Sequence, residues 1–160
     1  MESLNTTFLE RFRYNPVTGL VLCHRTKKGD RKTKPDGYKV IGTSYEGKMY
    51  YMREHRFAFL SMKGEIPKCV DHINGIKNDN RWENLRTATR SENNRNVGLR
   101  ADNITGVKGV YIRKNTGKYQ AQIMVKGKNK YVGVFETLEE ADKAIKSIRI
   151  LEHKEFTNDG

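Results

Sequence analysis

Hydrophobic and polar positions alternate most clearly in the C-terminal third of the chain. In residues 118–126, every second side chain falls on the same face of a strand. The more apolar of the two faces is formed by Tyr119, Ala121, Ile123 and Val125. Residues 109–113 and 130–135 predict two further strands, since turn signals at Asn115-Thr116-Gly117 and Gly127-Lys128-Asn129 separate the three segments. This region therefore predicts a small antiparallel sheet.

A helix is expected directly after this sheet. Thr137 and Glu140 have the spacing of a capping box, in which each side chain bonds the backbone N–H of the other residue. The apolar residues that follow recur at i, i+3, i+4 and i+7, and they are Ala141, Ala144, Ile145 and Ile148. A helix with this pattern covers one face of a small sheet, so we expect the opposite face to be free.

The central region changes from a helical pattern to a strand. Residues 54–62 carry apolar groups at helical spacing, and a glycine and a proline end the segment. His55 lies at the start of this helix, where a histidine is expected to be a capping or packing residue. Residues 68–73 then predict a strand that ends at the hairpin-turn signal Asn74-Gly75. A second capping-box pattern, Thr89 to Glu92, predicts a helix from about residue 90.

Shorter elements are expected in the N-terminal region. Residues 8–14 are typical of a short helix or an extended lead-in, and residues 20–22 predict a strand. Residues 37–41 and 48–52 predict a hairpin around a turn at 43–47, with tyrosines supplying β propensity. Taken together, the elements predict an α+β chain.

Composition favours several small modules and a polyanionic partner. Only 36% of the 160 residues are hydrophobic, which argues against one large core. The formal net charge is +12, which suits an acidic polymer because each neutralised phosphate releases counterions. The run from His24 to Lys34 is the most basic segment, and we expect it to lie along phosphates. Its candidate DNA-binding residues are Arg25, Lys27, Lys28, Arg31 and Lys32.

The cysteines and the apolar runs bear on cofactor and compartment. Cys23 and Cys69 are far apart and form no C-x-x-C pair, so a structural zinc site is not expected and no disulfide is required. No signal-peptide pattern opens the chain, and no apolar run approaches the ~20 residues that span a bilayer. We expect a soluble protein of a reducing, cytoplasmic compartment with no membrane partner.

Four polar side chains in residues 69–96 form a candidate site. A carboxylate such as Asp71 is a ligand for a hard cation, and His72 can take up a proton near neutral pH. Asn84 and Asn93 can orient both groups without adding charge. These residue types are typical of a hydrolytic site. The structural alternative is that Asp71-His72 only ends a strand and that the asparagines only build turns.

The order of these residues resembles the HNH nuclease motif in its phage and intron homing-endonuclease form. Asp71-His72 is followed by Asn84 within D-N-R-W-E-N-L and by Asn93 within S-E-N-N-R-N. The resemblance implies a ββα-metal core in which His72 is the general base and Asn84 holds its ring by a hydrogen bond. It also implies that Asp71 and Asn93 bind one Mg²⁺ or Mn²⁺ ion. With one protein carboxylate, that ion should bind weakly unless DNA phosphates and waters complete its shell.

The tail from Gly106 to about Leu151 resembles the ethylene-response-factor type of DNA-binding domain. The matching segments are G-V-Y-I-R, G-K-Y-Q-A-Q-I and Y-V-G-V-F-E-T-L-E-E-A. In that family, alternate residues of the sheet enter the major groove, which admits β-strands. The corresponding residues here are Tyr111, Arg113, Gln122, Met124 and Tyr131. Tyr111 replaces an arginine that is usual in the family, so the family's target sequence is not expected to carry over.

These expectations combine into four segments. We expect an N-terminal β-rich basic region with a helix at 1–66, an HNH ββα-metal core at 67–97, a linker at 98–106, and a DNA-binding sheet and helix at 107–160.

The expected function is that of a metal-dependent endonuclease acting on double-stranded DNA, of the homing type encoded by a phage or an intron. A monomer is the expected state, with a dimer as the alternative. The rival functions are a DNA-binding regulator that lost turnover and a basic RNA-binding protein.

Overall fold

A computed structural model of the protein describes residues 2–26, 33–125, 127–153, 156–157 and 159. Both helices and strands occur along these residues. The chain forms two compact units, Met1–Ala88 and Thr89–Gly160. Each contains small antiparallel sheets or helices of the kinds expected, which confirms the α+β class. The division into four segments stays a prediction. No helix among the described residues is both long and apolar enough to cross a bilayer.

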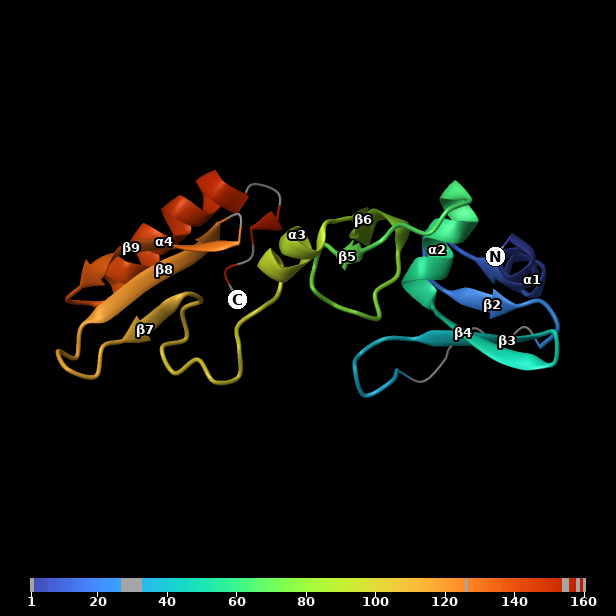
Figure 1. The fold of residues 1–160 in the computed structure, drawn as a ribbon, viewed down its shortest axis with the longest axis horizontal. Helices are drawn as coiled ribbons and strands as arrows, with labels where there is room; N and C mark the ends of the chain where they lie inside the picture. Colours follow the sequence, from blue (N-terminus) through green and yellow to red (C-terminus); the bar gives the residue numbers. More distant parts are fainter. Residues whose placement is uncertain (1, 27–32, 126, 154–155, 158, 160) are drawn as a thin grey trace. The chain divides into compact units, whose positions relative to one another are not determined.

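The described residues of the first unit form three two-stranded antiparallel sheets and two helices (Figure 1). Its core gathers aromatic and aliphatic side chains from all of these elements, including Phe8, Phe12, Ile41, Phe57 and Leu85. In chain order the elements are α1 (Glu2–Arg11), β1 (Phe12–Tyr14), β2 (Val21–Cys23), β3 (Val40–Tyr45), β4 (Lys48–Arg53), α2 (Glu54–Lys63), β5 (Val70–His72), the 3-10 turn η1 (Trp82–Asn84) and β6 (Leu85–Thr87).

Two expectations for this unit need correction. The segment at 8–14 is helical only to Arg11, after which the chain turns into β1 and pairs with β2. The hairpin turn expected at 43–47 is shorter, because β3 continues to Tyr45 and the turn is made by Glu46 and Gly47 alone. Both turn residues have positive φ, 48° and 73°. A two-residue turn of this kind matches the twist of the flanking strands, which favours it over a longer loop.

The second unit contains the predicted sheet and helix. Strands β7 (Val110–Ile112), β8 (Tyr119–Val125) and β9 (Lys128–Phe135) pair in that order, and α4 (Leu138–His153) lies across one face of the sheet (Figure 1). The buried cluster between them consists of Val110, Ala121, Ala141 and Ile145. The strand β9 begins at Lys128, two residues earlier than expected, because Lys128 pairs directly with Val125.

Both predicted capping boxes are confirmed. Thr89 Oγ1 accepts from the backbone N–H of Glu92, whose carboxylate accepts from Thr89 N, and this pair opens α3 (Arg90–Arg95). Thr137 and Glu140 make the same reciprocal pair ahead of α4.

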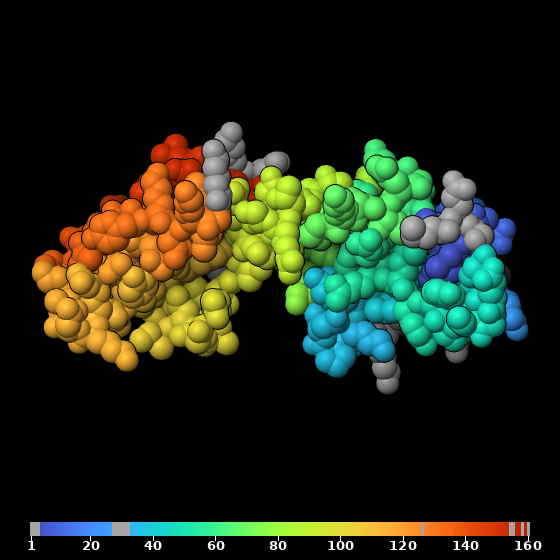
Figure 2. Space-filling model, in the orientation of Figure 1, coloured from blue at the N-terminus to red at the C-terminus, as the bar shows by residue number. Residues whose placement is uncertain are grey.

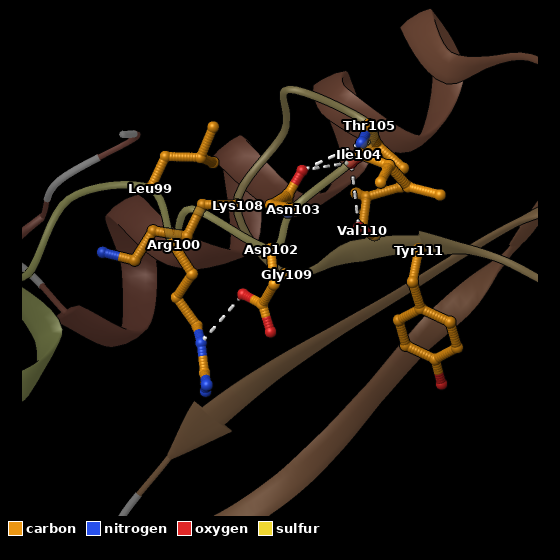
Figure 3. A pocket seen from close by; sticks show the side chains of 10 residues that line it. All are labelled: Leu99, Arg100, Asp102, Asn103, Ile104, Thr105, Lys108, Gly109, Val110 and Tyr111. Atoms are coloured by element: carbon orange, nitrogen blue, oxygen red, sulfur yellow. Dashed lines mark hydrogen bonds and ion pairs between the residues drawn. The ribbon is translucent and has the colours of Figure 1, made fainter.

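The segment that precedes β7 is ordered by side-chain hydrogen bonds. Asn103 Oδ1 accepts from the backbone N–H groups of Thr105 and Gly106, and its Nδ2 donates to Val107 O. Thr105 Oγ1 also donates to Val110 O at 3.0 Å. Asn103, Thr105 and Val110 are among the residues that line a cavity of about 350 Å³ within the second unit (Figure 3). Residues 103–106 of the expected linker therefore form a loop that is held by side-chain hydrogen bonds.

Gly19 packs closely against the backbone of residues 80 and 81 and so positions the loop before η1. It closes the β1–β2 turn, in which Asn15 Oδ1 accepts from Val17 N and Thr18 N. A Cβ atom added to Gly19 would lie 2.5 Å from Arg81 N and 2.6 Å from the carbonyl carbon of Asn80. Only glycine therefore allows the turn to approach the backbone at residues 80 and 81 this closely.

Replacing Gly19 with alanine is expected to destabilise the first unit more than the same change at Gly47. Both glycines have a φ of 73°, so the cost of a left-handed alanine, about 1 kcal/mol, is common to the two variants. At position 19 the added methyl group also overlaps backbone atoms, which should add ~1–3 kcal/mol to the loss. Urea unfolding of Gly19→Ala and Gly47→Ala measures the difference. Equal losses would contradict the close packing at Gly19.

Candidate active site

The two-stranded sheet of β5 and β6 positions the Asp71-His72 pair. Asp71 lies opposite Arg86, and His72 lies opposite Leu85. The side chains of Asp71 and His72 are both buried. The strand β5 ends at His72, where Gly75 N donates to His72 O at 2.9 Å. A turn therefore forms at the expected place, but the hairpin expected around Asn74-Gly75 is wrong, because the paired strand β6 begins only at Leu85.

Asp71 is held by a charged partner on the facing strand. Arg86 Nε and a terminal guanidinium nitrogen both donate to Asp71 Oδ2, at 2.8 and 2.7 Å. Both side chains are largely buried, so this charge-assisted pair is well shielded from water. A cation bound by the Asp71 carboxylate would therefore share it with a guanidinium.

The imidazole of His72 is enclosed by polar and aromatic groups. Its Nε2 lies 3.1 Å from Asn80 Oδ1. The ring of His55 meets it edge-on with centroids 5.2 Å apart, and the ring of Tyr38 lies 6.1 Å away. Burial lowers the pKa of His72 below that of a free histidine, although the Asn80 hydrogen bond and the Asp71 charge oppose the shift. The ring is therefore neutral near pH 7, the state that a general base requires.

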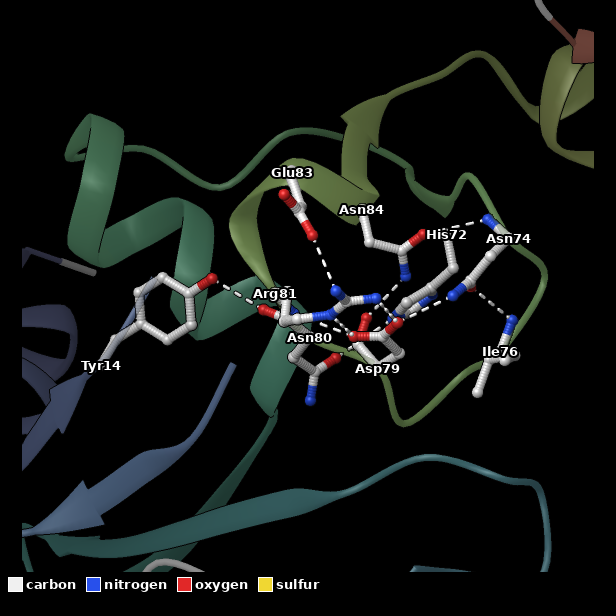
Figure 4. A network of polar contacts seen from close by, with 9 residues as sticks. All are labelled: Tyr14, His72, Asn74, Ile76, Asp79, Asn80, Arg81, Glu83 and Asn84. Atoms are coloured by element: carbon white, nitrogen blue, oxygen red, sulfur yellow. Dashed lines mark hydrogen bonds and ion pairs between the residues drawn. The ribbon is translucent and has the colours of Figure 1, made fainter. Parts of the chain in front are cut away.

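Asn84 lies at the base of the loop and bonds the backbone on both sides of it. Its Nδ2 donates to Asp79 O at 2.7 Å, and its Oδ1 accepts from Asn74 N at 3.0 Å. The Asn84 carboxamide thus spans the two sides of the loop, while His72 Nε2 bonds Asn80 (Figure 4). The hydrogen bond expected from Asn84 to the ring of His72 stays a prediction. A catalytic role for Asn84 stays a prediction.

Side-chain hydrogen bonds stiffen the whole loop at 73–84 (Figure 4). Asn74 Nδ2 donates to Asp79 Oδ2 at 2.7 Å, and Arg81 Nε donates to Asp79 Oδ1 at 2.9 Å. The Arg81 guanidinium, with help from Asn74, lowers the pKa of Asp79 to about 2. The loop is therefore held together by one ionised carboxylate and its neighbours.

Two cationic side chains lie beside the ring of Tyr38, the aromatic neighbour of His72. The guanidinium carbon of Arg53 lies 4.0 Å from the ring centroid of Tyr38, and the amine of Lys77 lies 5.3 Å from it. Arg53 also pairs with Asp36 at 3.0 Å. Sequence reasoning did not single out Tyr38, because a tyrosine in a predicted strand carries no signal of what its ring will contact.

The remaining predicted metal ligand lies in the second unit. Asn93 is in α3, and its nearness to Asp71 stays a prediction. Among the described residues, no group of three or more His, Cys, Asp and Glu side chains is arranged to hold a metal ion. The predicted ligand set, one carboxylate and one amide, is smaller than such a group and depends on phosphate and water for the rest.

The five predicted DNA-reading residues lie on or beside the exposed face of the β7–β9 sheet. Gln122 pairs directly with Tyr131, and the hydroxyl of Tyr111 lies 3.5 Å from Gln122 Oε1. Met124 and Tyr131 are 50% and 62% exposed, whereas the opposite face is buried under α4. Arg113, just beyond β7, is also exposed. The β8 and β9 segments form a continuous surface in the space-filling view (Figure 2). Contact with DNA stays a prediction.

The predicted basic loop falls largely outside the described residues. Arg25 is described and exposed at the end of β2. Lys27, Lys28, Arg31 and Lys32 lie outside the described residues.

Comparison with known proteins identifies the central segment. Residues 53–95 match a family model described as HNH endonuclease. No significant match was found among curated proteins. A solved structure concerned with DNA binding and cleavage by the HNH homing endonuclease I-HmuI aligns with 21% identity and a TM-score of 0.46, covering 90% of this chain and 86% of that one. The family match gives the chain an HNH endonuclease domain and confirms the predicted enzyme class, a nuclease. The resemblance of residues 106–151 to ethylene-response-factor domains stays a prediction.

The burial of His55 predicts a loss of stability in acid. Burial, together with the nearby charges of His72 and Arg53, lowers the pKa of His55 to about 3. Below pH 6.5 the unfolded chain takes up a proton that the folded chain refuses, so acid favours unfolding. The free energy of unfolding should fall by up to ~1.4 kcal/mol per pH unit for this residue between about pH 6 and pH 4. His55→Phe, which keeps a ring in the packing site, should show a shallower decline in urea unfolding across this range. The same slope in both proteins would contradict the burial of a neutral imidazole.

Proposed function

We propose that this chain is a metal-dependent DNA endonuclease of the HNH homing type in which His72 is the general base. The observation that carries the proposal is a buried, neutral imidazole at the end of β5, hydrogen-bonded through Nε2 to Asn80. This imidazole lies within the segment that matches the HNH endonuclease family.

The chemistry that this arrangement supports is hydrolysis of a phosphodiester. The neutral imidazole of His72 takes a proton from a water molecule, whose oxygen forms a bond to phosphorus as the bond from phosphorus to the 3′ oxygen breaks. Because the ring is pinned between Asn80 and His55, its orientation need not be fixed when substrate binds. The cations of Arg53 and Lys77 beside Tyr38 would favour a phosphate near this ring.

The residues proposed to hold the metal are Asp71 and Asn93. A carboxylate oxygen and an amide oxygen are ligands that Mg²⁺ and Mn²⁺ accept, so the donor set fits one such ion in kind. When bound, the ion would supply charge neutralisation at the phosphoryl oxygens and at the departing oxygen. Arg86 already balances the charge of Asp71. The protein alone should therefore bind the ion weakly, and DNA phosphates should strengthen its binding.

Double-stranded DNA is the proposed substrate. The net charge of +12 favours a polyanion. The exposed sheet face with Gln122, Met124 and Tyr131 offers hydrogen-bonding and apolar groups at a spacing that fits the major groove. A monomer encoded by a phage or an intron and acting inside a cell fits the resemblance to homing endonucleases.

Removing the imidazole of His72 is expected to abolish cleavage and preserve binding. A general base contributes about 10²–10⁴-fold to rate, so His72→Ala should lower the rate of nicking of supercoiled plasmid with Mg²⁺ by that factor. Retardation of the same DNA on gels should stay near that of the unaltered protein, since the charge is unchanged. Met62→Ala, at an exposed residue of the same unit outside the basic run, is the control and should cleave normally.

The outcomes of this experiment separate the proposal from its rivals. An unaltered protein that retards DNA and cuts none with Mg²⁺ or Mn²⁺ would be a regulator. Tighter binding to RNA than to duplex DNA at matched salt would make it an RNA-binding protein. A His72→Ala variant that still cuts at the normal rate would exclude His72 as the base.

Loss of one cation beside the exposed sheet face should weaken DNA binding. Arg113→Ala is expected to cost ~1–3 kcal/mol of binding free energy on a duplex that the protein cleaves. Lys143→Ala removes the same charge from α4, on the covered side of the sheet, and should cost less than about 0.5 kcal/mol. Titration by fluorescence anisotropy at a fixed salt concentration measures both. Equal losses of binding free energy in the two variants would show that only total charge matters. That result would contradict DNA binding by the exposed sheet face.

A further inference from the structure

The buried carboxylate of Glu54 lies next to Asn80 and has no role in the chemistry proposed above. Glu54, the first residue of α2, is 1% exposed. Asn80 is 2% exposed, and its carboxamide lies between this carboxylate and the imidazole of His72. Asn80 Nδ2 donates to Glu54 Oε2 across 3.4 Å, and Asn80 Oδ1 lies 3.1 Å from His72 Nε2. Three buried polar side chains from different elements therefore form one chain of contacts.

The donor and acceptor properties of these groups leave one arrangement of protons. The NH₂ of Asn80 faces Glu54, whose carboxyl oxygen accepts from it. The amide oxygen then faces the ring, and an oxygen of this kind only accepts. The Nε2 atom of His72 must therefore carry the proton. In a neutral imidazole this leaves the lone pair on Nδ1.

Two features of the fold favour this arrangement over its reverse. Glu54 lies in the first turn of α2, where the helix dipole stabilises a negative charge and so favours the ionised carboxylate. The backbone of Asn80 is held independently of its side chain, since its carbonyl accepts from the hydroxyl of Tyr14 at 2.7 Å and Gly19 abuts the next peptide. The carboxamide can therefore change its contacts mainly by turning over, and ionised Glu54 opposes that turn.

We infer that Glu54 and Asn80 are positioning residues that fix the tautomer of His72, so that Nδ1 is the nitrogen that accepts the proton from water. The inference rests on the proposed role of His72 as general base, while the tautomer itself can be observed without any cleavage. Neither positioning residue touches the reacting atoms. Loss of their action should lower kcat and leave DNA affinity in place.

The direct test is the proton position on His72. The protein labelled with ¹⁵N-histidine is studied by long-range ¹H–¹⁵N correlation NMR at about pH 8, and the His72 signals are assigned by their loss in His72→Ala. The unaltered protein should show the Nε2–H tautomer. Glu54→Gln has nearly the same shape but can donate, so Asn80 can turn over and a population with Nδ1–H should appear. Cleavage by this variant should fall about 10–100-fold in kcat, as is typical when a partner that orients a functional histidine is lost.

A matched control and a compensating variant separate positioning from folding. Glu65→Gln makes the same change at an exposed residue of the same unit and should alter neither the tautomer nor kcat. The double variant Glu54→Gln with Asn80→Asp reverses the donor and acceptor between positions 54 and 80 and conserves net charge. It should restore the Nε2–H tautomer and recover most of kcat. A merely structural role for Glu54 predicts no such recovery.

Each outcome decides the inference. An Nδ1–H tautomer in the unaltered protein, or a Glu54→Gln variant that keeps both the Nε2–H tautomer and full kcat, overturns it. If Glu54→Gln fails to fold, Asn80→Ala replaces it, because the backbone contacts of residue 80 remain. That variant should show mixed tautomers and the same loss of kcat, and unchanged values would overturn the inference. If the unaltered protein cuts no DNA, the proposed function fails, while the NMR result still decides how the proton on His72 is placed.

Discussion

Burial of the His72 imidazole favours its neutral form and requires suitable partners for its two nitrogens. This constraint accounts for the arrangement of the side chains around His72. His72 reaches its position because β5 ends there and turns away at Gly75. Its ring is then surrounded by Asn80, His55 and Tyr38, none of which carries a formal charge when His55 is neutral. Burial therefore lowers the pKa of both histidines and leaves a proton acceptor at neutral pH.

The loop at 73–84 shows how such a site is built without adding charge. Asn74 and Asn84 use their amides to tie together the two sides of the loop, so that the imidazole is not needed as a structural partner. Among the ionised groups of the loop, Arg81 pairs with both Asp79 and Glu83, and Lys77 lies beside the ring of Tyr38. Asp71 is likewise balanced by Arg86. The groups that face the ring of His72 are therefore polar or aromatic and uncharged, and the cations of Arg53 and Lys77 beside Tyr38 suit the approach of a phosphate.

Features that depend on neighbours along the chain could be predicted from the sequence, and features that depend on distant contacts could not. The capping boxes at Thr89 and Thr137, and the strands around Asn115–Gly117, are set by local hydrogen bonds and alternation. The motif also indicated the pair Asp71-His72 correctly as the end of a strand. It could not indicate that Asn80 meets the ring. Only the folded contacts with Tyr14 and Gly19, more than 60 positions away, place this amide there.

The most direct test of the central claim is a crystal structure of the protein bound to an uncleaved duplex, with Ca²⁺ in place of Mg²⁺ to prevent turnover. The account predicts that His72 Nδ1 lies about 3 Å from a water molecule placed in line with a phosphorus atom and its 3′ oxygen. The Asn80 carboxamide should still bond Nε2 on the far side of the ring. A ring of His72 that lies away from the DNA backbone, or that presents Nε2 to it, would contradict the account.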